Sequence, residues 1–224
     1  MAKLTQSKNP LVGGQVVQSV DIERLQSPVI LGRARPSGKR EIRDARRRKT
    51  ATNAIEGLTR NLTITGFTKG QFPLLDLLMA CIEITGPVSL VLSTWTAARR
   101  EIQALTDLQA RGDLLSARFL LDFTMVRRDP EAANAIRDSF GCESIRIAQN
   151  HSKFALFENN SWNLVLRTSM NLNMNPRFED FTIAHDPELM AFFNAIVNEI
   201  WAKQPSSLTD ERPKEIKRHF REKM

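Results

Sequence analysis

The sequence predicts an α/β fold in a single domain, with a mixed and mostly parallel sheet flanked by helices. From about residue 58 to residue 141, apolar runs of strand length alternate with segments of helical period. Glycine or proline stands at the changes of pattern, at Gly86-Pro87, Gly112 and Gly141. Strands that alternate with helices are typical of a sheet with parallel strands and covering helices.

The first half of this domain contains three strand–helix repeats. The middle strand is a nearly continuous apolar run, as expected for a strand that is buried on both faces. The first helix has leucines at the spacing of a helix packed on a sheet. The repeats are a strand at Leu62–Phe67 and a helix at Phe72–Thr85, a strand at Val88–Trp95 and a helix at Ala97–Arg111, and a strand at Leu114–Phe123 and a helix from Asp129-Pro130 to Phe140.

After Gly141 the pattern changes to strands without long helices between them. The turn at residues 158–161 lies between two apolar runs and indicates a hairpin. Asp186-Pro187 then begins a last helix, which extends to about Lys203. The expected strands are Ser144–Gln149, Lys153–Glu158, Trp162–Thr168 and Asp180–Ala184.

The two ends of the chain differ from this domain in composition and in apolar pattern. We expect residues 1–55 to form a basic, partly flexible extension, residues 56–205 to form the folded domain, and residues 206–224 to form a polar tail. Within the extension, Gln15–Val20 favours a short strand. The segment Glu41–Ile55 is compatible with a helix, since no residue that breaks a helix intervenes.

The basic segment from Arg33 to Lys49 carries the whole net charge of +7, and the rest of the chain is neutral. Such a segment suits contact with a phosphate backbone, so we expect nucleic acid, DNA or RNA, as a partner. The alternatives are a solvated tail and a contact with an acidic protein surface. The candidate nucleic-acid-binding residues are Arg33, Arg35, Lys39, Arg40, Arg43, Arg46, Arg47, Arg48 and Lys49.

Composition excludes several other classes of protein. No apolar run is long enough for a transmembrane helix, and the N-terminus lacks the apolar core of a secretory signal. The two cysteines form neither a disulfide framework nor a zinc motif. We therefore expect a cytoplasmic protein with no membrane partner, no metal and no cofactor.

Two short motifs on consecutive expected strands carry the candidate chemistry. His151 and Lys153 are two residues apart, as are Ser169 and Asn171, and alternate residues of a strand point to the same face. If the two strands pair through the turn at 159–161, all four side chains meet. Glu179 begins the next strand and can reach the imidazole of His151.

These residue types suit the cleavage of a phosphodiester. A neutral histidine can attack phosphorus and form a covalent phosphohistidine. Lysine and asparagine place positive charge and amide donors beside the phosphate oxygens, and a carboxylate can fix the histidine tautomer. Such a scheme requires no metal.

The motifs resemble those of the phospholipase D superfamily, which has His-x-Lys, four residues, Asp, and then Gly-Ser-x-Asn with a downstream Glu. The stretch from Ser169 to Glu179 resembles a subgroup found in phage and prophage proteins, which implies a phospholipase D-like fold and the host cytoplasm. The resemblance implies that His151 is the nucleophile, Lys153 and Asn171 bind phosphate, Ser169 supports them and Glu179 orients the histidine. Two positions depart from the family pattern, because Glu158 stands in place of Asp and Thr168 in place of Gly.

The family builds one active site from two copies of the motif. This chain has three histidines, and neither His185 nor His219 is followed by a second Ser-x-Asn motif. We therefore expect a homodimer with the site at its two-fold axis. The predicted function is a metal-independent nuclease. The alternatives are a nucleic-acid-binding or assembly protein without turnover and, third, a phospholipase.

Overall fold

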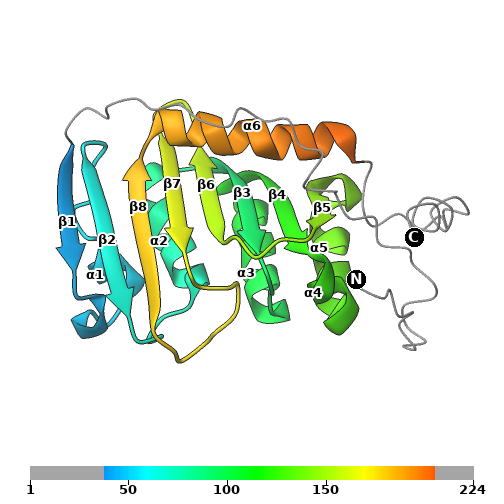
Figure 1. Ribbon diagram of the computed structural model, residues 1–224, viewed down its shortest axis with the longest axis horizontal. Coiled ribbons are helices and arrows are strands. Elements are labelled where there is room, and N and C mark those ends of the chain that lie inside the picture. The colour runs from blue at the N-terminus through cyan, green and yellow to red at the C-terminus, as the bar shows by residue number, and fades with distance from the viewer. Residues whose placement is uncertain (1–37, 205–224) are drawn as a thin grey trace, which may run out of the picture.

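The computed structural model describes residues 38–204, which form an eight-stranded sheet with helices on both faces (Figure 1). This arrangement confirms the α/β fold class. The expected strand at Gln15–Val20 and the expected tail at 206–224 lie outside the described residues. The strands are β1 (Lys39–Arg43), β2 (Leu62–Thr68), β3 (Val88–Thr94), β4 (Leu114–Asp122), β5 (Ile145–Ala148), β6 (Phe154–Glu158), β7 (Asn163–Thr168) and β8 (Glu179–His185).

The sheet has the strand order β1-β2-β8-β7-β6-β3-β4-β5. The neighbours β3, β4 and β5 pair in parallel, as the alternation of strands and helices predicts. The antiparallel strands β6, β7 and β8 lie between β3 and β2. Within the described sheet, β6 and β8 therefore run in one direction and the other six strands run in the opposite direction.

Helices cover the two faces of the sheet unequally. The helices that connect successive strands from β1 to β5 lie on one face, and the last helix crosses the other face (Figure 1). Among the described helices, none is both long and apolar enough to cross a membrane. The helices are η2 (Ala45–Arg47), α1 (Ala51–Ile55), α2 (Leu74–Thr85), α3 (Arg99–Ala110), α4 (Phe123–Arg128), α5 (Pro130–Phe140), η3 (Cys142–Ser144) and α6 (Pro187–Lys203).

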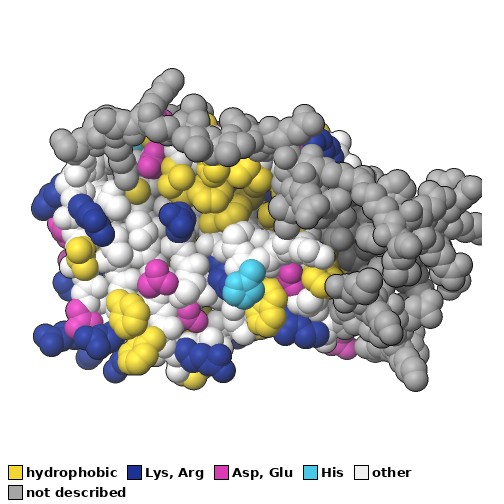
Figure 2. Space-filling view, viewed as in Figure 1, with side chains coloured by type: hydrophobic (Ala, Val, Ile, Leu, Met, Phe, Trp, Pro, Cys, Tyr) yellow, Lys and Arg dark blue, Asp and Glu magenta, His cyan; other side chains and the backbone are white. Residues whose placement is uncertain are grey.

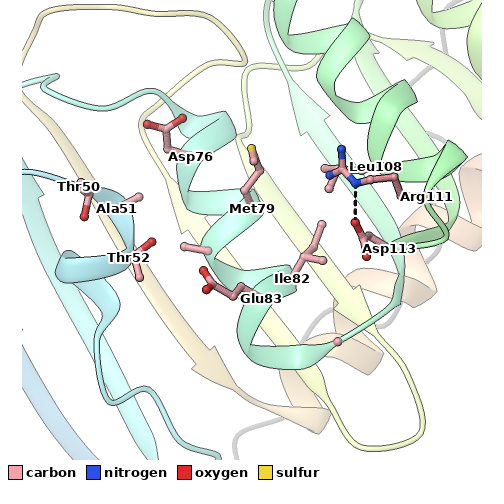
Figure 3. Close-up of a pocket in the computed structure, with 12 residues that line it drawn as sticks. Thr50, Ala51, Thr52, Asp76, Met79, Ile82, Glu83, Leu108, Arg111 and Asp113 are labelled. Atoms are coloured by element: carbon pink, nitrogen blue, oxygen red, sulfur yellow. Dashed lines mark hydrogen bonds and ion pairs between the residues drawn. The ribbon is translucent and has the colours of Figure 1, made fainter.

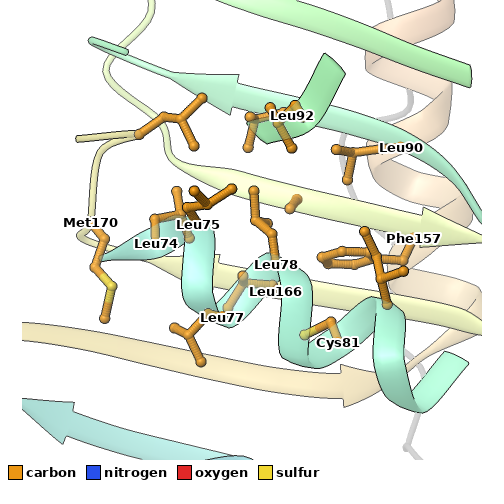
Figure 4. Packing of buried hydrophobic residues seen from close by; sticks show 14 of the residues in the cluster. Leu74, Leu75, Leu77, Leu78, Cys81, Leu90, Leu92, Phe157, Leu166 and Met170 are labelled. Carbon is orange, nitrogen blue, oxygen red and sulfur yellow. The ribbon is translucent and has the colours of Figure 1, made fainter. Parts of the chain in front are cut away.

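The main hydrophobic core lies between the sheet and the helices of the first face. Figure 4 shows Leu74 and Leu78 of α2 against Phe157 of β6 and Leu166 of β7. A second cluster joins the opposite face of β3, β6 and β7 to α6 through residues such as Val197. The central strands are thus buried on both faces, and polar side chains collect at the strand ends.

The predicted helix over Glu41–Ile55 is wrong. The segment begins with β1, which pairs in parallel with β2, and becomes α-helical only at α1. Hydrogen bonding to the edge of β2 is a tertiary contact that the segment's own sequence does not reveal. Ile42 on β1 is 77% exposed, so it contributes no core-facing pattern, whereas Ala45, Ala54 and Ile55 are fully buried. Part of the expected extension therefore belongs to the same sheet and core.

The third predicted strand ends one residue early, at Asp122. The Asp122 carboxylate accepts a hydrogen bond from the backbone N–H of Thr124 at 2.9 Å, which caps the short helix α4. A helix of only six residues has too few turns to give a periodic signal. The sequence pattern therefore missed α4.

Candidate active site

The candidate site lies at the edge of the sheet where β3 and β4 end. His151 and Lys153 precede β6, whose first residue pairs with Ser93 near the end of β3. The predicted hairpin between β6 and β7 is present, and it brings the end of β7, just before Ser169, to the same edge. Glu179 is the first residue of β8, which pairs with β7. The topology thus gathers these segments as the sequence predicts.

Hydrogen bonds on both sides of His151 hold its segment in place. The buried Asn150 donates from its backbone N–H to Asp122 Oδ2 at 3.0 Å and from Nδ2 to Ser93 Oγ at 2.9 Å. Ser152 donates from Oγ to Asn150 Oδ1 at 2.6 Å. The expected strand alternation of His151 and Lys153 is wrong, because residues 151–153 precede β6 and lie outside any strand. These hydrogen bonds fix the position of the segment instead. His151 itself is left exposed.

Lys153 lies beside His151. Its Nζ is 3.4 Å from His151 Nδ1 and donates to the His151 carbonyl at 2.9 Å. Partial burial lowers the pKa of Lys153, and the carboxylates of Glu179 and Asp122 act in the opposite direction. Two carboxylates thus stabilise the ammonium electrostatically, in a place where water solvates it less well than in bulk.

Glu179 is largely buried and bonds to Ser169. Ser169 Oγ donates to Glu179 Oε2 and accepts from the backbone N–H of Asp180 at 3.0 Å. Asn175 Nδ2 donates to the second carboxylate oxygen of Glu179 at 3.4 Å. Among the described residues, Glu179 makes no hydrogen bond to His151. Its predicted role in orienting that ring stays a prediction.

Asn171 lies in the loop that follows β7. The next residue, Leu172, donates from its backbone N–H to the Thr96 carbonyl at 3.1 Å and to Thr94 Oγ1 at 3.2 Å. This part of the loop therefore lies against the end of β3. The buried Oδ1 of Asn171 has no hydrogen-bond partner within residues 38–204, so this acceptor oxygen is left unsatisfied.

Trp95 and Arg128 extend the site on the side of β3. The Trp95 ring lies 5.7 Å from the His151 ring, centroid to centroid, at an angle of 57°. Arg128, at the end of α4, places its guanidinium carbon 4.0 Å from the centre of the Trp95 ring. Arg128 is exposed and has no carboxylate partner among the described residues, whereas nearby Arg99 is paired with Glu131 at 2.9 Å.

Asp122 and Arg128 were not among the predicted site residues. Asp122 ends a parallel strand, where polar side chains commonly face a ligand, and that position was a usable signal. Arg128 gave no such signal, because it lies on the short helix that the pattern missed. Thr168, which replaces the family's Gly, donates to the Asp180 carbonyl at 2.7 Å. Glu158, which replaces Asp, ends β6 at the opposite edge and accepts from Asn194 of α6 at 3.2 Å.

The described part of the basic segment begins in β1 and continues into the loop after it. Glu41 pairs with Lys39 at 3.1 Å and with Arg43 at 2.6 Å, so part of this charge is neutralised. Asp44 pairs with two further arginines. Arg33 and Arg35 lie outside the described residues. The candidate cations of this segment that are exposed are Lys39, Arg40, Arg46, Arg47, Arg48 and Lys49.

A cavity of about 550 Å³ opens elsewhere, beside α1, α2 and the end of α3 (Figure 3). Asp76, Glu83, Arg111 and Asp113 contribute its charged groups, and burial raises the pKa of Asp76. None of the five predicted site residues lines it. Within residues 38–204, no group of three or more His, Cys, Asp or Glu side chains is placed to hold a metal ion.

Comparison with known proteins gives distant structural similarities. No family model matches the sequence, and no curated protein matches it. A polyphosphate kinase from Porphyromonas gingivalis is 14% identical with a TM-score of 0.45, over 67% of this chain and 27% of that one. NucT from Helicobacter pylori is 13% identical with a TM-score of 0.46, over 62% of this chain and 96% of that one. The chain thus covers about a quarter of the polyphosphate kinase.

Proposed function

We propose that this chain is a phosphodiesterase of the phospholipase D type that cleaves nucleic acid without a metal ion. The observation that carries the proposal is the exposed His151 imidazole beside the partly buried Lys153 ammonium. A nucleophile must be accessible to its substrate. An ammonium that is partly removed from water interacts more strongly with a phosphate oxygen than a fully hydrated one.

In the proposed reaction, one imidazole nitrogen of His151 attacks phosphorus and the bond to the leaving oxygen breaks. Lys153 exchanges the His151 carbonyl, which it now binds at 2.9 Å, for a non-bridging phosphate oxygen. Asn171, in the loop after β7, donates from its side-chain Nδ2 to the same group of oxygens. Water then attacks the phosphohistidine and the phosphorus–nitrogen bond breaks, which releases the second product. The proton of this water passes to the imidazole that protonated the leaving oxygen.

The leaving oxygen needs a proton donor, and we assign this role to the partner subunit's His151 in a homodimer. The other histidine of the described region, His185, accepts at Nδ1 from the Asn163 backbone N–H at 3.1 Å, at the opposite edge of the sheet. His219 lies outside the described residues. A second copy of the chain supplies a second His151 if the two sites share an axis.

The substrate class rests on positive charge near the site. Because β1 and β3 run in the same direction, the loop after β1 opens at the same edge of the sheet as Trp95 after β3. Gln71 joins this loop to the start of α2 by donating from Nε2 to the Ala45 carbonyl at 2.6 Å. Lys and Arg side chains follow the lower edge of the face in Figure 2. A strand of phosphates fits such an edge better than an isolated headgroup does.

Cleavage in excess EDTA tests this proposal. The protein is incubated with single-stranded DNA, duplex DNA, RNA and phospholipid vesicles, beside His151→Ala. Cleavage of nucleic acid that persists in EDTA and disappears in the variant supports the proposal. Binding without cleavage would indicate a nucleic-acid-binding protein instead, and release of headgroups from vesicles would indicate a phospholipase.

Mixing wild-type and His151→Ala subunits tests the shared site. If each site needs His151 from both subunits, activity at constant total protein falls as the square of the wild-type fraction once the subunits exchange. If each subunit works alone, activity falls linearly. Analytical ultracentrifugation establishes the dimer independently, and a monomer with full activity would exclude the shared site.

A further inference from the structure

Two phenylalanine rings are stacked in solvent near the candidate site. Phe67 is 47% exposed and Phe178 is 68% exposed, and their centroids are 5.5 Å apart with an interplanar angle of 26°. The next residue after Phe178 is Glu179, whose carboxylate accepts from Ser169. We call Phe67 and Phe178 the aromatic pair.

The aromatic pair lies at the same edge of the sheet as His151. Phe67 is near the end of β2, and Phe178 immediately precedes β8, which pairs with β2. The starts of β8 and β6 are separated by two strand spacings, roughly 10 Å. The pair is therefore a few nucleotides from a phosphate bound at His151.

Positive charge flanks the aromatic pair. Lys69 follows Phe67 by two residues and Arg177 immediately precedes Phe178, and both cations are exposed. Neither has a carboxylate partner among the described residues. The exposed Asp180 lies opposite Phe67 in the register of β2 and β8. Figure 2 shows hydrophobic side chains between Lys and Arg side chains at the lower left edge of the face.

Close packing fixes the loop that carries Phe178. A Cβ on Gly70 would lie 2.3 Å from the Asn175 carbonyl oxygen and 2.7 Å from the Arg177 nitrogen, so only glycine fits there. Gly70 also has a positive φ of 75°, which other residues rarely adopt. The β2–α2 turn and the loop before β8 are thereby held together, and they present the two rings side by side.

We infer that the aromatic pair is a stacking platform for unpaired nucleobases, which makes the substrate of the proposed nuclease single-stranded. Bases in a duplex are already stacked and paired, whereas an unpaired base exposes its face to an aromatic side chain. The flanking Lys69 and Arg177 are suited to the phosphates on either side of those bases. This inference rests on the proposed function for its substrate, but it makes a separate statement about binding.

The rings and the cations together distinguish this surface from a simple apolar contact. Adjacent exposed apolar side chains can mark a binding surface, whereas a single one such as Leu115 is ordinary. A hydrophobic protein partner would leave the flanking cations without a role, whereas a single strand uses both rings and cations. Anionic membranes also attract aromatic and basic groups, and a vesicle measurement separates them from a strand.

The test measures binding on the His151→Ala protein, so that no strand is cut. The probes are a labelled single strand of about twelve nucleotides, an abasic strand with the same phosphates, and a duplex of the same length. We expect the natural strand to bind at least about tenfold more tightly than the abasic strand. The double variant Phe67→Ala, Phe178→Ala should remove that difference and leave the salt dependence unchanged.

Two further variants complete the design. Arg177→Gln should weaken natural and abasic strands alike and reduce the slope of log affinity against log salt by about 0.7. Leu115→Ala removes an apolar side chain that is 60% exposed on β4, and it should change neither measurement. Circular dichroism and sedimentation check that each variant keeps its fold and its oligomeric state.

Several results would overturn the inference. The first is equal binding of natural and abasic strands by the His151→Ala protein, and the second is unchanged discrimination between those strands in the double variant. The others are that the double variant loses binding to vesicles and not to strands, or that it converts a dimer to monomers. Failure of the proposed function has a different signature. Wild-type protein would then leave every strand uncut in EDTA, while the stacking results could still hold.

Discussion

Two trios of the same residue types lie at opposite edges of the sheet. At one edge Arg128 covers Trp95, and Trp95 lies against His151. At the other edge, the guanidinium carbon of Arg60 lies 5.5 Å from the centre of the Trp162 ring. Trp162 meets His185 edge-on, with ring centroids 5.6 Å apart. Residue types and ring distances are nearly the same, yet the surroundings of the two histidines differ.

The difference lies in what each histidine is bonded to. His185 is in β8 and accepts from the Asn163 backbone at the start of β7, so its ring helps to close the end of the sheet. His151 lies outside any strand, with neighbours on both sides tied down and its own ring exposed beside Lys153. An exposed ring on a fixed backbone is what the proposed nucleophile requires, and it sets His151 apart from His185 although the neighbouring residue types are the same.

The largest expected difference is between His151→Ala and His185→Ala. Loss of His151 should lower the kcat of DNA or RNA cleavage by about a thousandfold or more, because the nucleophile is gone. Loss of His185 should leave kcat nearly unchanged and lower the free energy of unfolding by about 1–2 kcal/mol, because the Asn163 N–H loses its acceptor. Single-turnover kinetics and urea unfolding measure the two effects.

Two other outcomes would contradict these expectations. A His185 variant that folds normally but does not cleave would place that ring in the chemistry. A His151 variant that keeps full activity would remove the nucleophile from the proposed reaction.

A smaller difference is expected between Arg128→Gln and Arg60→Gln. Arg128 lies over the Trp95 ring, which in turn lies against His151, and it has no described carboxylate partner, so we expect it to bind the phosphate next to the scissile one. We expect Arg128→Gln to raise KM for an oligonucleotide about fivefold, with little change for a dinucleoside monophosphate, which has a single phosphate. Arg60→Gln should change neither value, and both variants should lose less than about 1 kcal/mol of stability. Equal effects of Arg128→Gln on the two substrates would argue against a second phosphate contact.

The sequence predicted much of the fold because apolar patterns dominate its centre. Val88–Thr94 is buried along most of its length, and Gly112 and Gly141 end the helices before β4 and β5. It failed at β1, where the strand depends on pairing with β2 and its most apolar residue faces solvent. Local pattern predicts an element well only when that element's own residues make the core.

Part of the candidate site was also predictable from local patterns in the sequence. The predicted hairpin indicated that the segments of His151 and Ser169 meet at one edge. The expected strand alternation of His151 and Lys153 was wrong, because residues 151–153 lie outside any strand. From the sequence, Trp95 at its strand end could equally line the site or the core, and Trp162 was most simply a core residue, because only the chain topology determines which histidine each one meets. The aromatic pair was also hidden, because Phe67 and Phe178 are far apart in sequence and become neighbours only when β8 pairs with β2.

The smallest expected effect is on stability, and it concerns Lys153. Its pKa is lowered chiefly by burial, so the folded chain holds this proton less tightly than the unfolded chain does. At neutral pH the charged ammonium therefore opposes folding. As pH rises from the lowered value in the folded chain to the ordinary value, this cost disappears and stability increases.

Lys153→Met removes that dependence. We expect the variant to lose cleavage yet to be more stable at pH 7, by no more than about 1 kcal/mol because Lys153 keeps partial access to water. The stability advantage should shrink as pH rises into the alkaline range, and urea unfolding of both proteins across that range measures the shrinking difference. Lys69→Met, at an exposed lysine on the same edge, serves as the surface control for the stability measurement. A Lys153→Met protein less stable than wild type at pH 7 would instead show that attraction to Glu179 and Asp122 exceeds the cost of burying the ammonium. Lys153 would then stabilise the fold in addition to its proposed part in the chemistry.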